Sequence, residues 1–221
     1  MIHIKNLSKS FNKGIAKVNI LRDINFSIDD GEILCIMGPS GCGKSTLLGI
    51  IGGLDPPTTG NVVFNNINLY ELSNRDLNTF RNQNIGMIFQ NHNLLNELTC
   101  YENICLPLLF SRNIKQDNYN HVENTMRRLG LDKKSNLFSH QLSGGEQQRT
   151  SITRALIRNP RLLLADEPTG NLDQKNAKNI MNIFHEVIKD DKMSIVIVTH
   201  DADIAKQCHR IINMLDGRLL E

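Results

Sequence analysis

One turn near the start of the chain has the residue types and spacing that bind phosphate. It consists of Gly38, Pro39, Ser40, Gly41, Cys42, Gly43, Lys44, Ser45 and Thr46. This stretch fits the pattern G-x-x-x-x-G-K-[ST]. Glycines let successive backbone N–H groups converge on an anion, and a helix that starts there adds a positive dipole end. We expect Lys44 to bind the β- and γ-phosphates of a nucleotide and Ser45 to bind Mg²⁺.

The segments that flank this turn have the character that a phosphate-binding loop requires. Residues 33–37 form a short apolar run typical of a strand, and residues 47–51 can continue as a buried helix. A chance glycine-rich turn is the alternative interpretation, and the strand–turn–helix context argues against it.

Other polar residues also follow apolar, strand-like runs. The runs lie at residues 33–37, 85–89, 162–165 and 194–198. The polar positions that follow them are Gly38, Gln90, Asp166 and His200. Ligands of open α/β sheets bind at the carboxyl ends of the strands. We therefore expect these four positions to meet at one edge of a parallel sheet.

These polar side chains match the needs of phosphoryl transfer to water, which are charge neutralisation, a metal ion and a positioned water. We expect Asp166 to hold hydrated Mg²⁺ and Gln90 to reach the same ion or the attacking water. Glu167 is the candidate to orient and deprotonate that water, and we expect the following Pro168 to hold it in an extended conformation. His200 can donate to the γ-phosphate. Taken singly, such residues are more often solvated or structural.

A second glycine-containing turn lies at residues 142–147 (Leu-Ser-Gly-Gly-Glu-Gln). Ser143 is suited to cap a helix, and Glu146 completes a capping box. Gly144 and Gly145 leave backbone N–H groups open, which makes a second anion site at a helix start. A well-capped helix is the simpler alternative. Two phosphate sites for one evident nucleotide are explained by a head-to-tail dimer, in which each copy closes over ATP held by the other.

The elements that position these residues alternate between strand and helix at both ends of the chain, which favours a right-handed parallel core. Residues 1–7 read as an edge strand, residues 12–19 as a polar loop and residues 24–28 as a second strand. Ser73 caps a helix expected to reach residue 81. Further expected elements are a helical lobe at 91–159, a central strand at 162–165, a helix at 174–189 and a final strand at 211–215.

Composition narrows the class of protein. The chain has 221 residues, 40% of them hydrophobic, and a net charge of +2, so it can form a core and does not point to nucleic acid. The sequence contains no apolar run of the roughly 18–20 residues that span a bilayer. Its N-terminus also lacks a signal-peptide pattern, so we expect a cytoplasmic protein. The five cysteines suggest free thiols. Cys42 is either a small filler or a reactive thiol at a helix start.

In order and spacing, these motifs resemble the ATP-binding cassette (ABC) ATPases. The matching positions are residues 38–45, Gln90, residues 142–147, residues 164–167, residues 172–173 and His200. The resemblance covers the whole chain and implies an α/β P-loop NTPase (RecA-like) core. That core has a mixed, mainly parallel sheet, N-terminal antiparallel strands and an inserted α-helical subdomain. It implies one domain over 1–221, with the core at 1–90 and 160–221 and the helical subdomain at 91–159.

The same resemblance implies ATP and Mg²⁺ as cofactors and a homodimer that drives integral membrane permease subunits. Phe11 would stack on the base, where the family often has tyrosine. Ser143, Gly144, Gly145 and Asp173 would contact ATP held by the partner copy. The chain would be peripheral on the inner face of the cell membrane, attached through the permease, and would not bind nucleic acid.

Finer features resemble the branch of macrolide export, lipoprotein release and antimicrobial-peptide resistance. They lie at residues 52–55, 93–95, 98–99, 102–103, 106–107, 140–141 and 170–173. Departures are Asn96 for the usual proline, and Ser151 and Thr153 for alanine. We expect a docking surface for the membrane subunit around residues 94–98, where leucines can equally belong to the core.

Other functions remain open at this stage. One is a signalling ATPase that gates a cell-envelope process through a membrane partner without moving cargo. Cassettes that act on DNA or ribosomes carry a second cassette or a long coiled coil, whereas 122 positions without heptads separate Lys44 from Asp166. A small-molecule kinase would leave Glu167 and Ser143 without a role.

Overall fold

The computed structural model describes residues 1–13, 16–110, 116–191 and 193–220. The strands are β1 (Ile2–Lys13), β2 (Ala16–Ile28), β3 (Ile33–Met37), β4 (Thr59–Phe64), β5 (Ile67–Asn68), β6 (Ile85–Ile88), β7 (Leu162–Asp166), β8 (Ser194–Thr199), β9 (Arg210–Leu215) and β10 (Arg218–Leu220). The α-helices are α1 (Lys44–Ile51), α2 (Asn74–Asn84), α3 (Cys100–Leu109), α4 (Gln116–Arg128), α5 (Gly144–Leu156), α6 (Gln174–Asp191) and α7 (Ala202–Ala205). Short 3₁₀ helices lie at Leu69–Glu71, Asp132–Lys134 and Ser139–Gln141.

The first sheet is antiparallel, with strand order β2-β1-β4-β5. The expectation of an edge strand at residues 1–7 is wrong, because β1 pairs with β2 on one side and with β4 on the other. The expected loop at 12–19 is also largely strand. Phe11 pairs with Val18 and Asn12 with Lys17. The pairing of β1 with β2 therefore continues into an exposed, mostly polar part of both strands.

The second sheet has strand order β10-β9-β3-β8-β7-β6. Its strands β6, β7, β8, β3 and β9 are parallel, and β10 is antiparallel to β9. Every residue of β8 is buried, as expected for a strand covered on both faces. β7 is interior as predicted, but it lies next to the edge strand β6, and β3 and β8 are the central pair.

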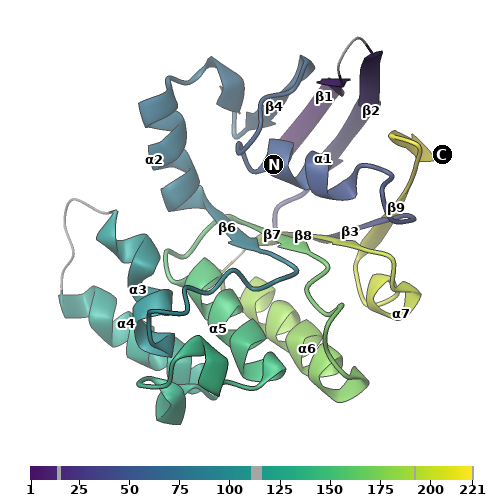
Figure 1. Cartoon of the computed structure of the whole chain (residues 1–221). Coiled ribbons are helices and arrows are strands. Elements are labelled where there is room, and N and C mark those ends of the chain that lie inside the picture. The colour runs from purple at the N-terminus through teal and green to yellow at the C-terminus, as the bar shows by residue number, and fades with distance from the viewer. Residues whose placement is uncertain (14–15, 111–115, 192, 221) are drawn as a thin grey trace.

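The hydrophobic core has two halves, one on each face of the parallel sheet (Figure 1). Because side chains alternate along a strand, Leu162 and Leu164 of β7 face α1 and the antiparallel sheet. Leu163 and Ala165 face the opposite side, where the helical lobe and α6 pack. The sheet is therefore fixed from both faces, which holds the carboxyl ends of its strands in place.

Helices α3, α4 and α5 all lie within residues 91–159, where the sequence predicts a helical lobe. Thr99 and Ser143 cap α3 and α5 with complete capping boxes, and Ser73 caps α2, which runs past the expected end to Asn84. The architecture is the predicted α/β arrangement of a mainly parallel sheet, antiparallel N-terminal strands and a helical lobe. In the part of the chain that the structure describes, we find no helix both long and apolar enough to cross a bilayer.

Candidate nucleotide site

A cavity of about 280 Å³ opens at the carboxyl edge of the parallel sheet. Its lining consists of Ile20, Ser40, Gly41, Gly43, Lys44, Ser45, Thr46, Gln90, Asp166, Glu167 and His200. The predicted convergence of Gln90, Asp166 and His200 beside the glycine-rich turn is therefore confirmed. Their roles in binding and chemistry stay predictions.

The backbone of the glycine-rich turn follows from its glycines. Gly41 and Gly43 have φ values of 80° and 107°, which L side chains rarely adopt. At Gly38 the constraint is space, since an added Cβ would lie 2.2 Å from the carbonyl oxygen of Met214 in β9. Helix α1 starts directly after this turn, at Lys44.

Lys44 is only 7% exposed, and its ammonium stays inside the turn. Nζ donates to the carbonyl oxygens of Gly38 at 2.7 Å and Pro39 at 2.9 Å. The positive charge is therefore held against the backbone of the turn, where it can neutralise a bound phosphate.

Ser45 and Asp166 connect the turn to β7. The Ser45 hydroxyl donates to Oδ1 of Asp166 at 3.1 Å. Burial raises the pKa of Asp166, with the neighbouring Glu167 acting in the same direction, while the Ser45 hydrogen bond and Lys44 oppose it. A carboxylate that lacks solvation in this way is suited to a cation.

Glu167 departs from the expected backbone. The predicted extended conformation is wrong, since its φ is +46°, in the left-handed region. The sheet overrides the effect of Pro168, because the Glu167 N–H donates to the carbonyl of Val198 at 2.9 Å. The carboxylate accepts from Thr199 Oγ1 at 2.9 Å and lies 2.8 Å from His200 Nδ1. Strained backbones of this kind cluster at functional sites.

The segment after β6, which contains Gln90, is fixed by neighbouring elements. The side-chain amide of Asn171 donates to the Gln90 carbonyl at 3.2 Å. The Arg154 guanidinium of α5 donates to the carbonyls of His92 and Asn93, each at 2.7 Å. Gln90 therefore lies between the cavity at the sheet edge and the helical lobe.

Phe11 and Cys42 lie at the margin of the site. Phe11 is 44% exposed and carries Lys9 Nζ 4.8 Å from its ring centroid, and it is not among the described residues that line the cavity. Cys42 is 6% exposed and packs into the core beside Met214, so its side chain acts as filler there.

The second glycine-containing turn lies outside this cavity. Ser143 and Gly144 are exposed, and among the described residues nothing approaches within 4 Å of a Cβ added at Gly144. A Cβ at Gly145 would contact Asn176 at 3.1 Å. Asn176 in turn donates to both carboxylate oxygens of Asp173, at 2.8 and 2.9 Å. Asn176 therefore connects the turn to Asp173, and neither the turn nor Asp173 is among the described residues that line the chain's own cavity.

Several residues of the site are missed by the motifs. Thr199 holds the Glu167 carboxylate, Ile20 lines the cavity from β2, and Asn171 fixes Gln90. Thr199 carries a usable signal, because it ends a buried β-branched strand directly before His200. The contribution of Ile20 depends on how the two sheets pack, which no local pattern contains.

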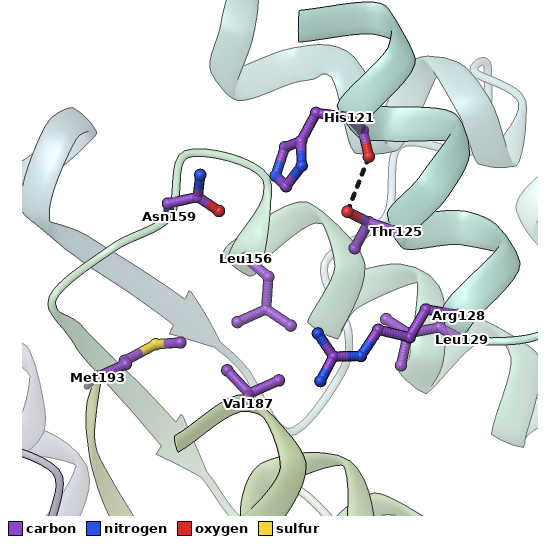
Figure 2. A pocket seen from close by; sticks show the side chains of 8 residues that line it. All are labelled: His121, Thr125, Arg128, Leu129, Leu156, Asn159, Val187 and Met193. Atoms are coloured by element: carbon purple, nitrogen blue, oxygen red, sulfur yellow. Dashed lines mark hydrogen bonds between the residues drawn. The ribbon is translucent and has the colours of Figure 1, made fainter. Parts of the chain in front are cut away.

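A separate cavity of about 40 Å³ lies between α4, the end of α5 and α6 (Figure 2). Leu156, Val187 and Met193 form its apolar side. The Nε2 atom of His121 is buried without a hydrogen-bond partner in the described part of the chain, whereas Thr125 donates to the His121 carbonyl at 2.8 Å. The volume of this cavity is large enough for a water molecule. It is too small for a nucleotide.

Comparison with known proteins agrees with the site. A sequence profile described as "ABC transporter" matches residues 21–170. The structure of MJ0796, described as a dimeric bacterial ABC transporter cassette, is 40% identical, with a TM-score of 0.93, over 100% of this chain and 97% of that one. A second MJ0796 structure, a dimeric post-hydrolysis state bound to ADP and Pi, is 39% identical over the same shares, also with a TM-score of 0.93.

A further similar structure is cbiO1 from Clostridium perfringens, described as part of the ABC transporter complex cbiONQ. It is 28% identical, with a TM-score of 0.88, over 100% of this chain and 86% of that one. The profile match and the identity to MJ0796 over the full chain decide the family: this chain belongs to the ABC transporter family, as one of its ATPase cassettes.

Proposed function

We propose that two copies of this chain bind two ATP molecules head to tail and hydrolyse them to drive a membrane permease. The observation that carries the proposal is the separation of two anion-binding turns. The turn at residues 38–46 lines the cavity together with Asp166 and Glu167, whereas Ser143 and Gly144 are exposed elsewhere. A partner copy provides the phosphate that the second turn is built to contact. The relative MJ0796 is described as dimeric.

ATP fits the first turn. The backbone N–H groups of residues 38–46 and the Lys44 ammonium bind its phosphates, and the exposed ring of Phe11 stacks on the adenine. Ser143, Gly144, Gly145 and Asp173 contact ATP held by the partner copy.

Mg²⁺ fits the residues beside the phosphates. Ser45 and Asp166 place a hydroxyl and a carboxylate 3.1 Å apart, and the Gln90 side chain lines the same cavity. Among the described residues there is no cluster of three His, Cys, Asp or Glu side chains suited to a metal. Mg²⁺ commonly takes one or two protein oxygens and completes its shell with phosphate and water. When bound, the ion neutralises charge on the β- and γ-phosphates.

The chemical step uses Glu167 as general base. Its carboxylate accepts a proton from the water that attacks the γ-phosphate. His200, with its side chain 64% exposed, donates toward the γ-phosphate, and Gln90 positions the water or the metal. Lys44 stabilises the negative charge that develops on the transferred group.

Substitution of Gly144 tests the dimer without harming the fold. Gly144→Asp places a carboxylate at the first position of α5, where it is compatible with the helix dipole and meets no described residue. We expect an unchanged unfolding temperature and unchanged ATP binding by the isolated copy. We also expect loss of the dimer that Glu167→Gln accumulates with ATP and Mg²⁺, since the carboxylate repels the partner's phosphates. Full dimerisation of the double variant in size-exclusion chromatography would contradict the head-to-tail arrangement.

A groove beside the edge strand β6 is the proposed docking surface for the permease. It has a volume of about 1610 Å³ and is lined by residues of α2, β6 and the end of α3, among them Leu54, Met87 and Phe110. Phe110 is 78% and Leu54 48% exposed. A second hollow, next to the segment that follows β6, shares part of this lining, and Leu95 of that segment is 48% exposed. Most of the lining is polar or charged, and exposed apolar side chains such as Phe110 and Leu54 lie among these polar residues. A mixed surface of this kind suits a helical loop of a membrane protein.

A matched pair of variants tests the docking surface. Phe110→Asp should abolish co-purification with the membrane permease and leave the ATPase activity of the isolated cassette unchanged. Leu220→Asp changes a side chain 51% exposed on β10, outside the groove, and should keep the permease bound. Equal co-purification of both variants would remove this groove from the proposal.

The proposed branch is that of macrolide export, lipoprotein release or antimicrobial-peptide resistance, and the proposed location is the inner face of the cell membrane, through the permease. The sequence features at residues 52–55 and 170–173 support the branch. The description of cbiO1 as part of a transporter complex supports the membrane assembly. Co-purification of a permease with a large extracytoplasmic domain would support the branch, and a permease without one would contradict it.

A further inference from the structure

Both carboxylate oxygens of Glu167 are held by consecutive residues at the end of β8. Thr199 Oγ1 donates to Oε2 at 2.9 Å, and His200 Nδ1 lies 2.8 Å from Oε1. Thr199 is fully buried, whereas the His200 side chain is 64% exposed. The two partners therefore differ in how freely they can move.

The direction of the Thr199 hydrogen bond is fixed. Its hydroxyl oxygen accepts from the backbone N–H of Asp201 at 3.0 Å, so its single proton is directed to Glu167. Asp201 is itself held as the N-cap of α7, where Oδ1 accepts from the N–H of Asp203 at 2.8 Å. Met37 of β3 pairs with Thr199 in the sheet. The Thr199 hydroxyl is thus held in two ways: the sheet fixes the backbone of Thr199, and the Asp201 N–H donates to the hydroxyl oxygen.

The backbone of Glu167 is anchored to the same strand end. Its N–H donates to the carbonyl of Val198 at 2.9 Å, and its φ of +46° is held by the sheet register that pairs Asp166 with Val198. Main chain and side chain of Glu167 are therefore both fixed by β8. Of the two carboxylate partners found among the described residues, His200 is the one with an exposed side chain.

We propose that Thr199 is a positioning residue that keeps the Glu167 carboxylate aimed at the attacking water, while His200 is the exchangeable partner. This inference rests on the proposed role of Glu167 as general base. Each carboxylate oxygen has two lone pairs, so Oε2 can keep the Thr199 hydrogen bond while Oε1 accepts the proton of water. Without Thr199 the carboxylate can rotate away from the water.

Two substitutions at position 199 separate the hydroxyl from the shape of the side chain. In Thr199→Val, which keeps the shape, we expect kcat for ATP hydrolysis to fall about tenfold to a hundredfold, the scale of a small misplacement. The KM for ATP should change little, because the residues that bind phosphate are untouched. Thr199→Ser restores the hydroxyl and should recover most of kcat. In the Glu167→Gln background Thr199→Val should cause no further loss, since residues that act as a unit are not additive.

The outcomes distinguish the positioning role of Thr199 from the proposed role of Glu167 as general base. Full turnover by Glu167→Gln would remove Glu167 as the base, and the role of Thr199 with it. If Glu167→Gln is inactive but Thr199→Val keeps the wild-type kcat, the base stands and the positioning role is wrong. The positioning role is also wrong if Thr199→Ser loses as much activity as Thr199→Val, or if Thr199→Val raises KM as much as it lowers kcat. Thermal unfolding of each variant with nucleotide absent checks that the cassette is folded.

Discussion

Gln148 in α5 donates from Nε2 to the carbonyl oxygen of Pro168 at 2.6 Å. Both residues are buried, and Pro168 directly follows Glu167. The hydrogen bond therefore joins the helix that starts at the exposed glycine turn to the loop that carries the proposed base. The two half-sites of one chain are connected through it.

Gln148→Met should break this connection while keeping the side-chain volume similar. It leaves the Pro168 carbonyl buried without its donor, so we expect a loss of about 1–3 kcal/mol in the free energy of unfolding. Turnover should fall as well, because the loop of Glu167 loses a support. The control is Thr153→Val, which removes a part-buried hydrogen bond of 2.7 Å from the Thr153 hydroxyl to the Arg149 carbonyl within α5 itself. Chemical denaturation and ATPase assays should show a stability loss in both variants and a marked loss of turnover only in Gln148→Met.

The sequence was sufficient for the parts of the site that one local segment determines. The turn at residues 38–46 and the capping box of Ser143 and Glu146 both follow from short-range geometry, and both are confirmed. The convergence of Gln90, Asp166 and His200 followed from a rule about parallel sheets. To apply this rule, it was enough to recognise from the sequence where each apolar strand ends.

The parts that failed depend on pairing between distant segments. The backbone of Glu167 adopts the left-handed conformation because the register of β7 against β8 directs its N–H to the Val198 carbonyl. This long-range contact outweighs the local effect of Pro168. Thr199 reaches Glu167 for the same reason. β1 is interior because β4, more than fifty residues later, pairs with its free edge. Register and strand order are properties of the sheet, so a local pattern does not contain them.

Cys208 should be the first cysteine to react with a thiol reagent in the native protein. It is half-buried, while Cys35, Cys42, Cys100 and Cys105 are each buried. A hydrogen bond between Cys35 and Cys208 raises the pKa of Cys35 and lowers the pKa of Cys208, which favours the Cys208 thiolate. We expect one fast-reacting thiol by mass spectrometry, and its disappearance in Cys208→Ser. Fast labelling of Cys42 instead would mean that the glycine-rich turn opens in solution.

Glu32 should make the stability of the cassette sensitive to acid. Burial would raise its pKa, but hydrogen bonds from Arg210, at 2.6 and 3.0 Å, and from the Asp29 N–H outweigh burial and lower it. A lowered folded-state pKa gives stability that is present above the unfolded value of about 4.3 and is lost as pH falls through the folded value.

The variant that tests this is Glu32→Gln. At neutral pH we expect it to cost about 1–2 kcal/mol, discounted because Arg210 is partly exposed. Below about pH 4.3 its unfolding free energy should fall less steeply with pH than that of the wild type. Urea denaturation at a series of pH values measures how the unfolding free energy of each protein depends on pH. Identical slopes for Glu32→Gln and the wild type would show that Glu32 does not cause the loss of stability in acid.

Gly38 should tolerate no side chain, whereas Gly49 inside α1 should tolerate one. Gly38→Ala places a Cβ 2.2 Å from the Met214 carbonyl oxygen, so either β9 or the phosphate-binding turn must move. We expect a loss of about 1–3 kcal/mol in the free energy of unfolding from overpacking, together with weaker nucleotide binding as the turn is displaced. Gly49→Ala is the matched control, because nothing described lies within 4 Å of its added Cβ and the position is inside a helix. That variant should gain about 0.5–1 kcal/mol and bind nucleotide as before. Urea denaturation and nucleotide titration compare the pair. If Gly38→Ala is as stable and binds as tightly as Gly49→Ala, the close approach of β9 does not constrain the turn.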